Sequence, residues 1–213
     1  MTKISIYLSG SIKKGKDDTK RSFWTYDDMK YIINNIHGYE VNILNPATEN
    51  IKRSNPLENF GADLYLVKMS DFLFTDLREK RGIGVGSEMT MAKYYKIPVI
   101  SICPKESNYR RSKLENVCGE DLYDWIHPFV LGLSDKIVEN LKEAIEWVNE
   151  FVKRSTYIKD LDKKPHPVDE FQKISNNWEK NDIKDFGIID EAIRLFIENQ
   201  LDNSAELDDA NGN

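Results

Sequence analysis

Short apolar runs alternate with amphipathic stretches along the first 154 residues of this 213-residue chain. Compact apolar runs bounded by turn residues are typical of buried strands, and they occur at residues 3–8, 40–44, 71–75 and 97–102. Apolar residues at helical spacing predict helices at residues 20–36, 56–69, 87–96 and 135–153. Strands and helices in this order predict one α/β domain, residues 1–154, in which helices cover both faces of a parallel sheet.

The sequence outside these elements is more polar. Residues 104–120 show no clear periodicity and are predicted to be irregular. Residues 155–167 contain two prolines and several charges, which predict a linker. Residues 168–200 then predict a short helical extension, and residues 201–213 predict an acidic, disordered tail.

The distribution of charge limits the class of ligand. The chain carries 30 basic and 36 acidic side chains, which give a net charge of −6. Residues 155–213 contain 7 of the basic and 14 of the acidic side chains, so the negative charge is concentrated there. An acidic tail repels polymeric nucleic acid, and no long basic stripe compensates for it elsewhere. We therefore expect a small-molecule ligand and no nucleic-acid partner.

The sequence also limits the location of the protein. No apolar run approaches the roughly 18–20 residues that a membrane span needs, and because the first residues predict a strand, we expect no signal or transit peptide. Cys103 and Cys118 are too few for a disulfide framework and lack metal-ligand spacing, and a lone His127 before a proline is interpreted as structural. We expect a cytoplasmic protein with reduced thiols, no membrane association and no bound metal.

A loop of small residues and lysine, Gly10-Ser11-Ile12-Lys13, follows the first predicted strand. In a parallel sheet the ligand sits beyond the carboxyl ends of the strands, where this loop lies. Small residues let a ligand approach the backbone, whose N–H groups bind phosphate, and lysine adds positive charge. The same residues also suit an ordinary turn, so the loop alone does not establish a site.

A second glycine-rich segment, residues 82–86, leads into a predicted helix with Glu88 in its first turn. Glu88 is either an ordinary helix-dipole residue or a carboxylate at the mouth of the site, kept ionised by amide dipoles as a nucleophile requires. Paired carboxylates suit chemistry at a sugar carbon, and Asp63 is a candidate for the second one. Asp76 either lines the site or shapes its turn, whereas Asp71 is interpreted as a structural charge.

Taken together, these motifs resemble the nucleoside 2-deoxyribosyltransferase family. That family combines an N-terminal strand ending in Tyr-x-x-Gly-Ser-Ile with a later glycine-rich loop ending in Gly-x-Glu before a helix. Here the first motif is Tyr7 with residues 10–12, and the second ends at Glu88. Asp63 matches the aspartate that the family carries on the preceding helix, and the resemblance covers about residues 3–150. It implies a Rossmann-like or flavodoxin-like doubly wound parallel sheet, to which the helical C-terminal extension is added.

The resemblance implies an N-glycosidase that needs no cofactor. Glu88 would attack the anomeric carbon of a (deoxy)nucleoside or its 5′-monophosphate and form a covalent glycosyl intermediate. Tyr7 would orient the Glu88 carboxylate, and Asp63 would protonate or hydrogen-bond the departing base. Water as the acceptor makes a hydrolase, which we favour, and a second base makes a transferase.

The expected substrate site extends beyond these three residues, to Gly10, Ser11, Ile12, Lys13, Asp76, Gly84, Gly86 and Ser112. In the family's 5′-monophosphate hydrolases, a serine six positions before the nucleophile binds the phosphate. Gly82 stands at that position here, and Lys80 or Arg81 is a candidate substitute.

The same family completes its sites across subunit interfaces. Ser112 matches a serine that the neighbouring subunit supplies, so a homodimer or larger homo-oligomer is expected, with residues 105–130 at the interface. Apolar residues of that segment are the candidate contacts: Tyr109, Tyr123, Trp125 and Phe129.

Two other functions fit parts of the pattern. A non-catalytic nucleotide sensor that signals through the C-terminal extension would keep the fold, but it has less need of Tyr7, Asp63 and Glu88 together. A dinucleotide-dependent oxidoreductase would carry its glycine fingerprint after the first strand and not after the third. We therefore expect an enzyme, with the sensor as the alternative.

Overall fold

The computed structural model describes residues 2–11, 24–47, 55–117, 119–153, 193–194 and 196–198. In chain order the first elements are β1 (Thr2–Ser9), α1 (Tyr26–Asn35), β2 (Tyr39–Leu44), α2 (Pro56–Lys68) and β3 (Phe72–Asp76). They are followed by α3 (Ile83–Tyr94), β4 (Val99–Ile102), β5 (Arg110–Val117), β6 (Glu120–Ile126), α4 (Pro128–Leu133), β7 (Lys136–Val138) and α5 (Leu141–Lys153).

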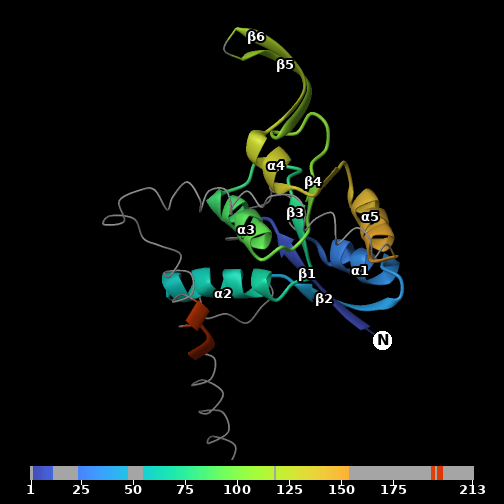
Figure 1. Ribbon diagram of the computed structural model, residues 1–213, viewed down its shortest axis with the longest axis vertical. Coiled ribbons are helices and arrows are strands. Elements are labelled where there is room, and N and C mark those ends of the chain that lie inside the picture. The colour runs from blue at the N-terminus through green and yellow to red at the C-terminus, as the bar shows by residue number, and fades with distance from the viewer. Residues whose placement is uncertain are drawn as a thin grey trace, which may run out of the picture.

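Within the described residues, five parallel strands form the central sheet, in the order β2-β1-β3-β4-β7. Helices α1 and α5 cover one face, and α2, α3 and α4 cover the other (Figure 1). This is the doubly wound α/β architecture expected from the sequence, with the flavodoxin-like strand order. The order reverses between β1 and β3, so the carboxyl ends of these two strands border the crevice in which such sheets bind ligands.

Side chains alternate along β1 and so divide it between the two faces of the sheet. Ile4, Ile6 and Leu8 pack in the core beneath α1 and α5, whereas Tyr7 packs in the core beneath α2 and α3. Ser9 lies two residues beyond Tyr7 and therefore points to the same face. All five residues of β3 are buried, which explains why this strand reads as a continuous apolar run.

The starts of α1 and α2 follow from local capping. Thr25 and Asp28 form a reciprocal capping box at the start of α1. Asn55 caps α2 and is followed by Pro56, which suits the first helical position. The predicted helix at residues 20–36 was therefore too long at its start, and its residues 20–23 lie outside the described residues.

Two further predicted helix boundaries are wrong. Helix α3 begins at Ile83 and not at residue 87, so the glycine-rich segment is its first turn. Helix α5 begins at Leu141 and not at residue 135, because residues 136–138 form β7 and pair with β4. The side chain of Asn140 accepts a hydrogen bond from the Glu143 N–H and caps the later start.

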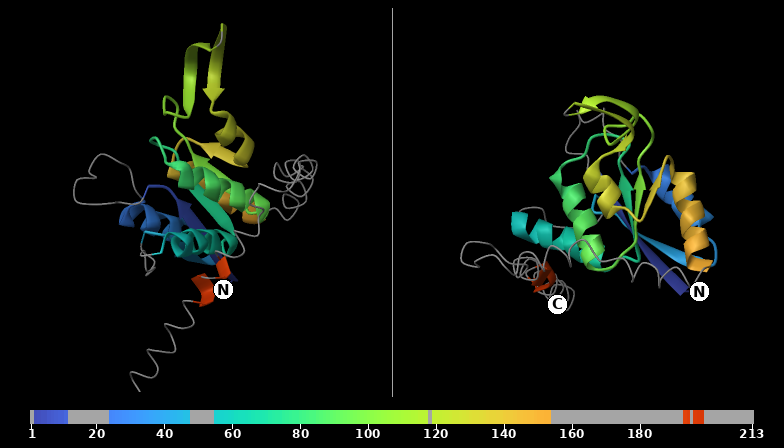
Figure 2. Two further views of the ribbon diagram at one scale, coloured as in Figure 1. Left: turned by 90° about the vertical axis from the view of Figure 1, so that its left-hand side faces the viewer. Right: turned by 45° about the horizontal axis from the view of Figure 1, so that its top comes forward.

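Residues 104–120, predicted to be irregular, include most of an antiparallel hairpin. Strands β5 and β6 pair with each other and form a separate two-stranded sheet. Figure 2 shows this hairpin standing out from the central sheet. Its exposed residues are polar on both sides of β5, so the sequence shows no alternation that would indicate a strand.

Only a short piece of the predicted C-terminal extension is described. Residues 193–194 and 196–198 are helical, the buried side chain of Ile193 joins the core beneath α2 and α3, and Phe196 is also buried. The ring of Phe196 lies 5.6 Å from that of Tyr65 on α2. The predicted linker and acidic tail lie outside the described residues. Among the helices that the structure does describe, none combines the length and apolar character needed to cross a bilayer.

Candidate active site

The candidate nucleophile lies where α3 crosses the carboxyl end of β1. Glu88 is in the second turn of α3, and its side chain is only 9% exposed. The Tyr7 hydroxyl donates a hydrogen bond to Oε1 of Glu88 at 3.0 Å. The Ser9 hydroxyl donates a short hydrogen bond to Oε2. Both carboxylate oxygens are therefore held by side chains of β1.

The environment of Glu88 disfavours its charge. Burial raises the pKa of Glu88 to about 7, and the charge of Asp63 adds to this increase. The hydrogen bonds from Ser9 and Tyr7 act in the opposite direction but do not cancel the effect of burial. The sequence predicted that Glu88 lies in the first turn of a helix, where amide dipoles would keep it ionised. This prediction is wrong, because Glu88 lies in the second turn and the first turn of α3 contains no acidic residue.

Asp63 reaches the same place from α2. Its side chain is half-buried, and it lies close enough to Glu88 for its charge to raise the pKa of that carboxyl. Tyr7, Asp63 and Glu88 come from three different elements, yet the fold brings them together at one edge of the sheet. A pair of acidic groups beside a hydroxyl donor can provide a nucleophile and an acid–base group.

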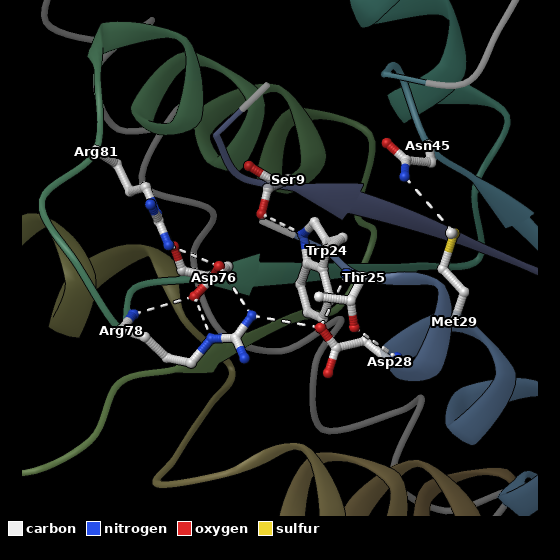
Figure 3. Close-up of polar contacts among 9 residues, drawn as sticks. All are labelled: Ser9, Trp24, Thr25, Asp28, Met29, Asn45, Asp76, Arg78 and Arg81. Atoms are coloured by element: carbon white, nitrogen blue, oxygen red, sulfur yellow. Dashed lines mark hydrogen bonds and ion pairs between the residues drawn. The ribbon is translucent and has the colours of Figure 1, made fainter. Parts of the chain in front are cut away.

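Asp76, for which the sequence left a binding role and a turn-shaping role open, has its charge engaged by neighbouring side chains. Its carboxylate is fully buried at the end of β3, between Arg78 and Arg81 (Figure 3). Burial acts to raise the pKa of Asp76, but hydrogen bonds and charges from both arginines outweigh it and hold the pKa below its ordinary value. Asp76 also accepts a hydrogen bond from the Arg78 N–H, so it shapes its turn.

Arg81 links this turn to the first loop. Its guanidinium, 1% exposed, forms an ion pair with Asp76 and donates to the Ser11 hydroxyl at 2.9 Å. Its backbone N–H donates to the Tyr109 hydroxyl at 2.7 Å. The ion pair with Asp76 and the hydrogen bond to Ser11 already engage the guanidinium of Arg81. The structure therefore does not support Arg81 as a substitute for the missing phosphate-binding serine.

Gly10 and Ser11 lie at this edge of the sheet, as expected. A Cβ atom at Gly10 would lie 3.0 Å from Nε1 of Trp24 and 3.4 Å from Cβ of Asp76, so a side chain here would press against the Trp24 indole. The Trp24 indole donates to the Ser9 carbonyl at 3.0 Å and fixes the end of β1. Ile12 and Lys13 lie outside the described residues.

The remaining predicted binding residues are less well placed. Gly84 and Gly86 are exposed in the first turns of α3, and a Cβ atom at either would meet nothing within 4 Å. Ser112 is exposed on the β5–β6 hairpin, where its N–H donates to the Glu106 carboxylate. The structure therefore does not bring Ser112 to Glu88 within one chain.

A groove of about 510 Å³ runs beside α3, and its volume is typical of small-molecule sites. Its lining is mainly apolar and includes Phe60, Ile83, Tyr109, His127 and Phe129. The rings of Tyr109 and Phe129 lie 5.8 and 5.9 Å from that of His127. Across the described ranges, no three His, Cys, Asp or Glu side chains converge in a way that could hold a metal ion.

The sequence interpretation missed Ser9, although a signal for it was present. Ser9 follows Tyr7 by two positions in a predicted strand, so the alternation of β1 places both side chains on one face. It also missed the Asp76–Arg78–Arg81 network, for which the sequence offers only proximity along the chain.

Comparison with known proteins adds little. No protein-family model matches the sequence, and no curated protein matches it significantly. One similar solved structure is that of the CMP N-glycosidase BcmB from Clostridium botulinum, at 12% identity and a TM-score of 0.38, covering 68% of this chain and 98% of that chain. A likeness this weak carries no argument about activity.

Proposed function

We propose that the protein is a nucleoside 2-deoxyribosyltransferase-like N-glycosidase that acts on a (deoxy)nucleoside or its 5′-monophosphate. The observation that supports this most strongly is the buried Glu88 carboxylate, held on both oxygens and placed beside Asp63 at the carboxyl end of β1. Chemistry at an anomeric carbon needs two carboxyl groups in different protonation states, and this site offers a pair.

In the first step, an oxygen of ionised Glu88 attacks the anomeric carbon of the sugar. The bond from that carbon to the base nitrogen breaks, and its electron pair leaves with the base. In the reactive form of the pair, Glu88 is ionised and Asp63 carries the proton, which Asp63 donates to the departing base. Tyr7 keeps the carboxylate in the orientation needed for attack. The product of this step is a glycosyl ester of Glu88.

In the second step, water attacks the same carbon and releases Glu88 as a carboxylate. Asp63, which lost its proton in the first step, accepts a proton from the water. A free base in place of water would yield a new nucleoside. We favour water, so the expected activity is hydrolysis, with base exchange as a competing outcome.

The test is a product assay on purified protein. Each deoxynucleoside and its 5′-monophosphate is incubated with and without a free acceptor base, and products are separated by chromatography. We expect free base from the wild type and at least a hundredfold less from Glu88→Gln, because glutamine cannot form the ester. Glu143→Gln, on α5 across the sheet, is the matched control and should retain activity.

Two outcomes of this assay would contradict the proposal. Free base at a normal rate from Glu88→Gln would exclude Glu88 as the nucleophile. A wild type that releases no base from any substrate, yet binds nucleotide, would favour the non-catalytic sensor.

A further inference from the structure

Ser9, like Tyr7, donates a hydrogen bond directly to the Glu88 carboxylate. Residues two apart on a strand lie on one face, so β1 presents the hydroxyls of Tyr7 and Ser9 side by side to α3. Each hydroxyl reaches a different oxygen of the same carboxylate, Tyr7 to Oε1 and Ser9 to Oε2. Both side chains are completely buried, so water does not compete for these contacts.

The position of Ser9 is itself fixed. Its carbonyl accepts a hydrogen bond from the Trp24 indole, and its backbone pairs in register with Thr75 of β3. Hydroxyls rotate freely about one bond, and Ser9 has a single proton to donate. A buried carboxylate directly opposite is the strongest acceptor for that proton, since charge-assisted hydrogen bonds exceed neutral ones.

We propose that Ser9 is a positioning residue for the proposed reaction: with Tyr7 it fixes the plane of the Glu88 carboxylate and stabilises its negative charge. This inference rests on the proposed function, because it assigns Ser9 a role through the proposed nucleophile.

The balance of effects at Glu88 supports this role. Burial and the Asp63 charge both disfavour ionisation, and the Ser9 hydrogen bond lowers the pKa of Glu88 more than the Tyr7 bond does. A nucleophilic carboxylate must be ionised, so the loss of Ser9 would reduce the fraction of active enzyme at neutral pH. If Ser9 were lost, Tyr7 would still donate to Oε1 of Glu88, but Oε2 would have no donor from β1.

Three variants separate this role from a general structural one. Ser9→Ala removes the donor, and Ser9→Cys keeps a similar volume but supplies a much weaker donor. Ser101→Ala is the matched control, because Ser101 is equally buried and lies in register with Ser9 through Thr75. The hydroxyl of Ser101 pairs with that of Ser134 instead of with Glu88.

The first readout does not depend on activity. The full chain is labelled with ¹³C at glutamate carboxyls, the Glu88 signal is assigned with Glu88→Gln, and its titration is followed by NMR. We expect a midpoint about one pH unit higher in Ser9→Ala, a smaller increase in Ser9→Cys and no change in Ser101→Ala. An unchanged midpoint in a folded Ser9→Ala or Ser9→Cys protein would overturn the inference.

The second readout is the pH profile of kcat/KM. Its acidic limb should move with the NMR midpoint, which corresponds to about a fivefold loss in Ser9→Ala at pH 7 and recovery at higher pH. A shifted NMR midpoint in a protein without activity would refute the proposed function but support the Ser9–Glu88 coupling. Normal activity with an unshifted profile in Ser9→Ala would refute the inference and leave the proposed function standing.

Discussion

Burial of Glu88 and the neighbouring charge of Asp63 both disfavour the ionisation of this carboxyl. Its pKa in the folded protein is about 7, against an ordinary value of 4.5. Between these two values the folded state holds a proton that the unfolded state releases. The free energy of unfolding therefore decreases as the pH rises through this range. The active-site carboxylate thus reduces stability at neutral and alkaline pH.

Glu88→Gln should remove this pH dependence because glutamine does not titrate. Between pH 5 and pH 8 the unfolding free energy of the variant should rise relative to wild type by about 2.5 kcal/mol. Urea unfolding at the two pH values measures the difference, and Glu143→Gln should show no such change. The same difference between variant and wild type at both pH values would mean that the pKa of Glu88 is not raised.

Asp63→Asn should separate the two roles assigned to Asp63. Loss of its charge should lower the pKa of Glu88, which moves the acidic limb of kcat/KM to lower pH. Loss of the acid should reduce the rate by about 10²-fold on ordinary substrates. A nucleoside with an N7-methylated purine leaves without protonation, so its rate should fall less than tenfold. Equal losses on both substrates would exclude Asp63 as the acid.

The sequence predicted part of this site. Tyr7, Asp63 and Glu88 were singled out because they match motifs of the family that the sequence resembles, and the fold brings the three side chains together. Asp76 was only partly understood, since its neutralisation by Arg78 and Arg81 depends on a fold of the turn that linear spacing does not reveal.

Among the elements, the sequence predicted the long apolar strands and helices well and the short or atypical ones poorly. Gly82, Gly84 and Gly86 indicated a turn because glycine is a poor helix former, yet the packing of Val85 and Met89 makes α3 begin at Ile83. Strand β7 has three residues, too few to show a period of two.

Asp135 explains how so short a strand is held in place. Its carboxylate accepts from the Val99 N–H at the start of β4 and forms an ion pair with Lys93 of α3. Its backbone N–H also donates to the Val99 carbonyl. One side chain thus joins α3, β4 and the approach to β7.

Asp135→Ala should lower the free energy of unfolding by about 2–3 kcal/mol, because it leaves the Val99 N–H and the Lys93 ammonium without this acceptor. Asp135→Asn keeps an acceptor for the N–H and should lose only about 1 kcal/mol. Urea unfolding measures both. Equal losses in the two variants would show that the hydrogen bond to Val99 contributes nothing.

At the scale of the whole molecule, the class of fold was predictable from the sequence, but the added hairpin was not. Alternating strands and helices led to the doubly wound sheet, whose edge then brings distant residues together. The described exposed residues of β5 are polar on both of its sides, so the pattern of this strand does not differ from that of a loop. A two-stranded hairpin is only marginally stable in isolation.

The surface near this hairpin bears on the homodimer that we propose. Tyr109 packs against the core and bonds to Arg81, and it also lines the apolar groove. Phe129 and Ile83, in contrast, line the apolar groove and are 72% and 92% exposed. Large exposed apolar side chains around one groove are typical of association surfaces.

Phe129→Ser should therefore weaken self-association by about tenfold or more. Tyr26→Ser is the matched control, because Tyr26 is similarly exposed at 75% but lies on α1, on the opposite face of the sheet. Sedimentation equilibrium of the wild type and both variants measures the dissociation constant. A monomeric wild type at all concentrations would refute the dimer.

The central claim is that Glu88 bonds covalently to the sugar. A 2-fluoro substituent on the sugar destabilises the positively charged transition state, so the ester forms but breaks down slowly. The wild type is incubated with 2′-deoxy-2′-fluoroarabinosyl nucleosides and their 5′-monophosphates, and its intact mass is followed by mass spectrometry. The account predicts the added mass of one fluorinated sugar or sugar phosphate, located on the peptide that contains Glu88 and absent from Glu88→Gln. An adduct on another residue, or release of base from ordinary substrates at an undiminished rate by Glu88→Gln, would contradict it.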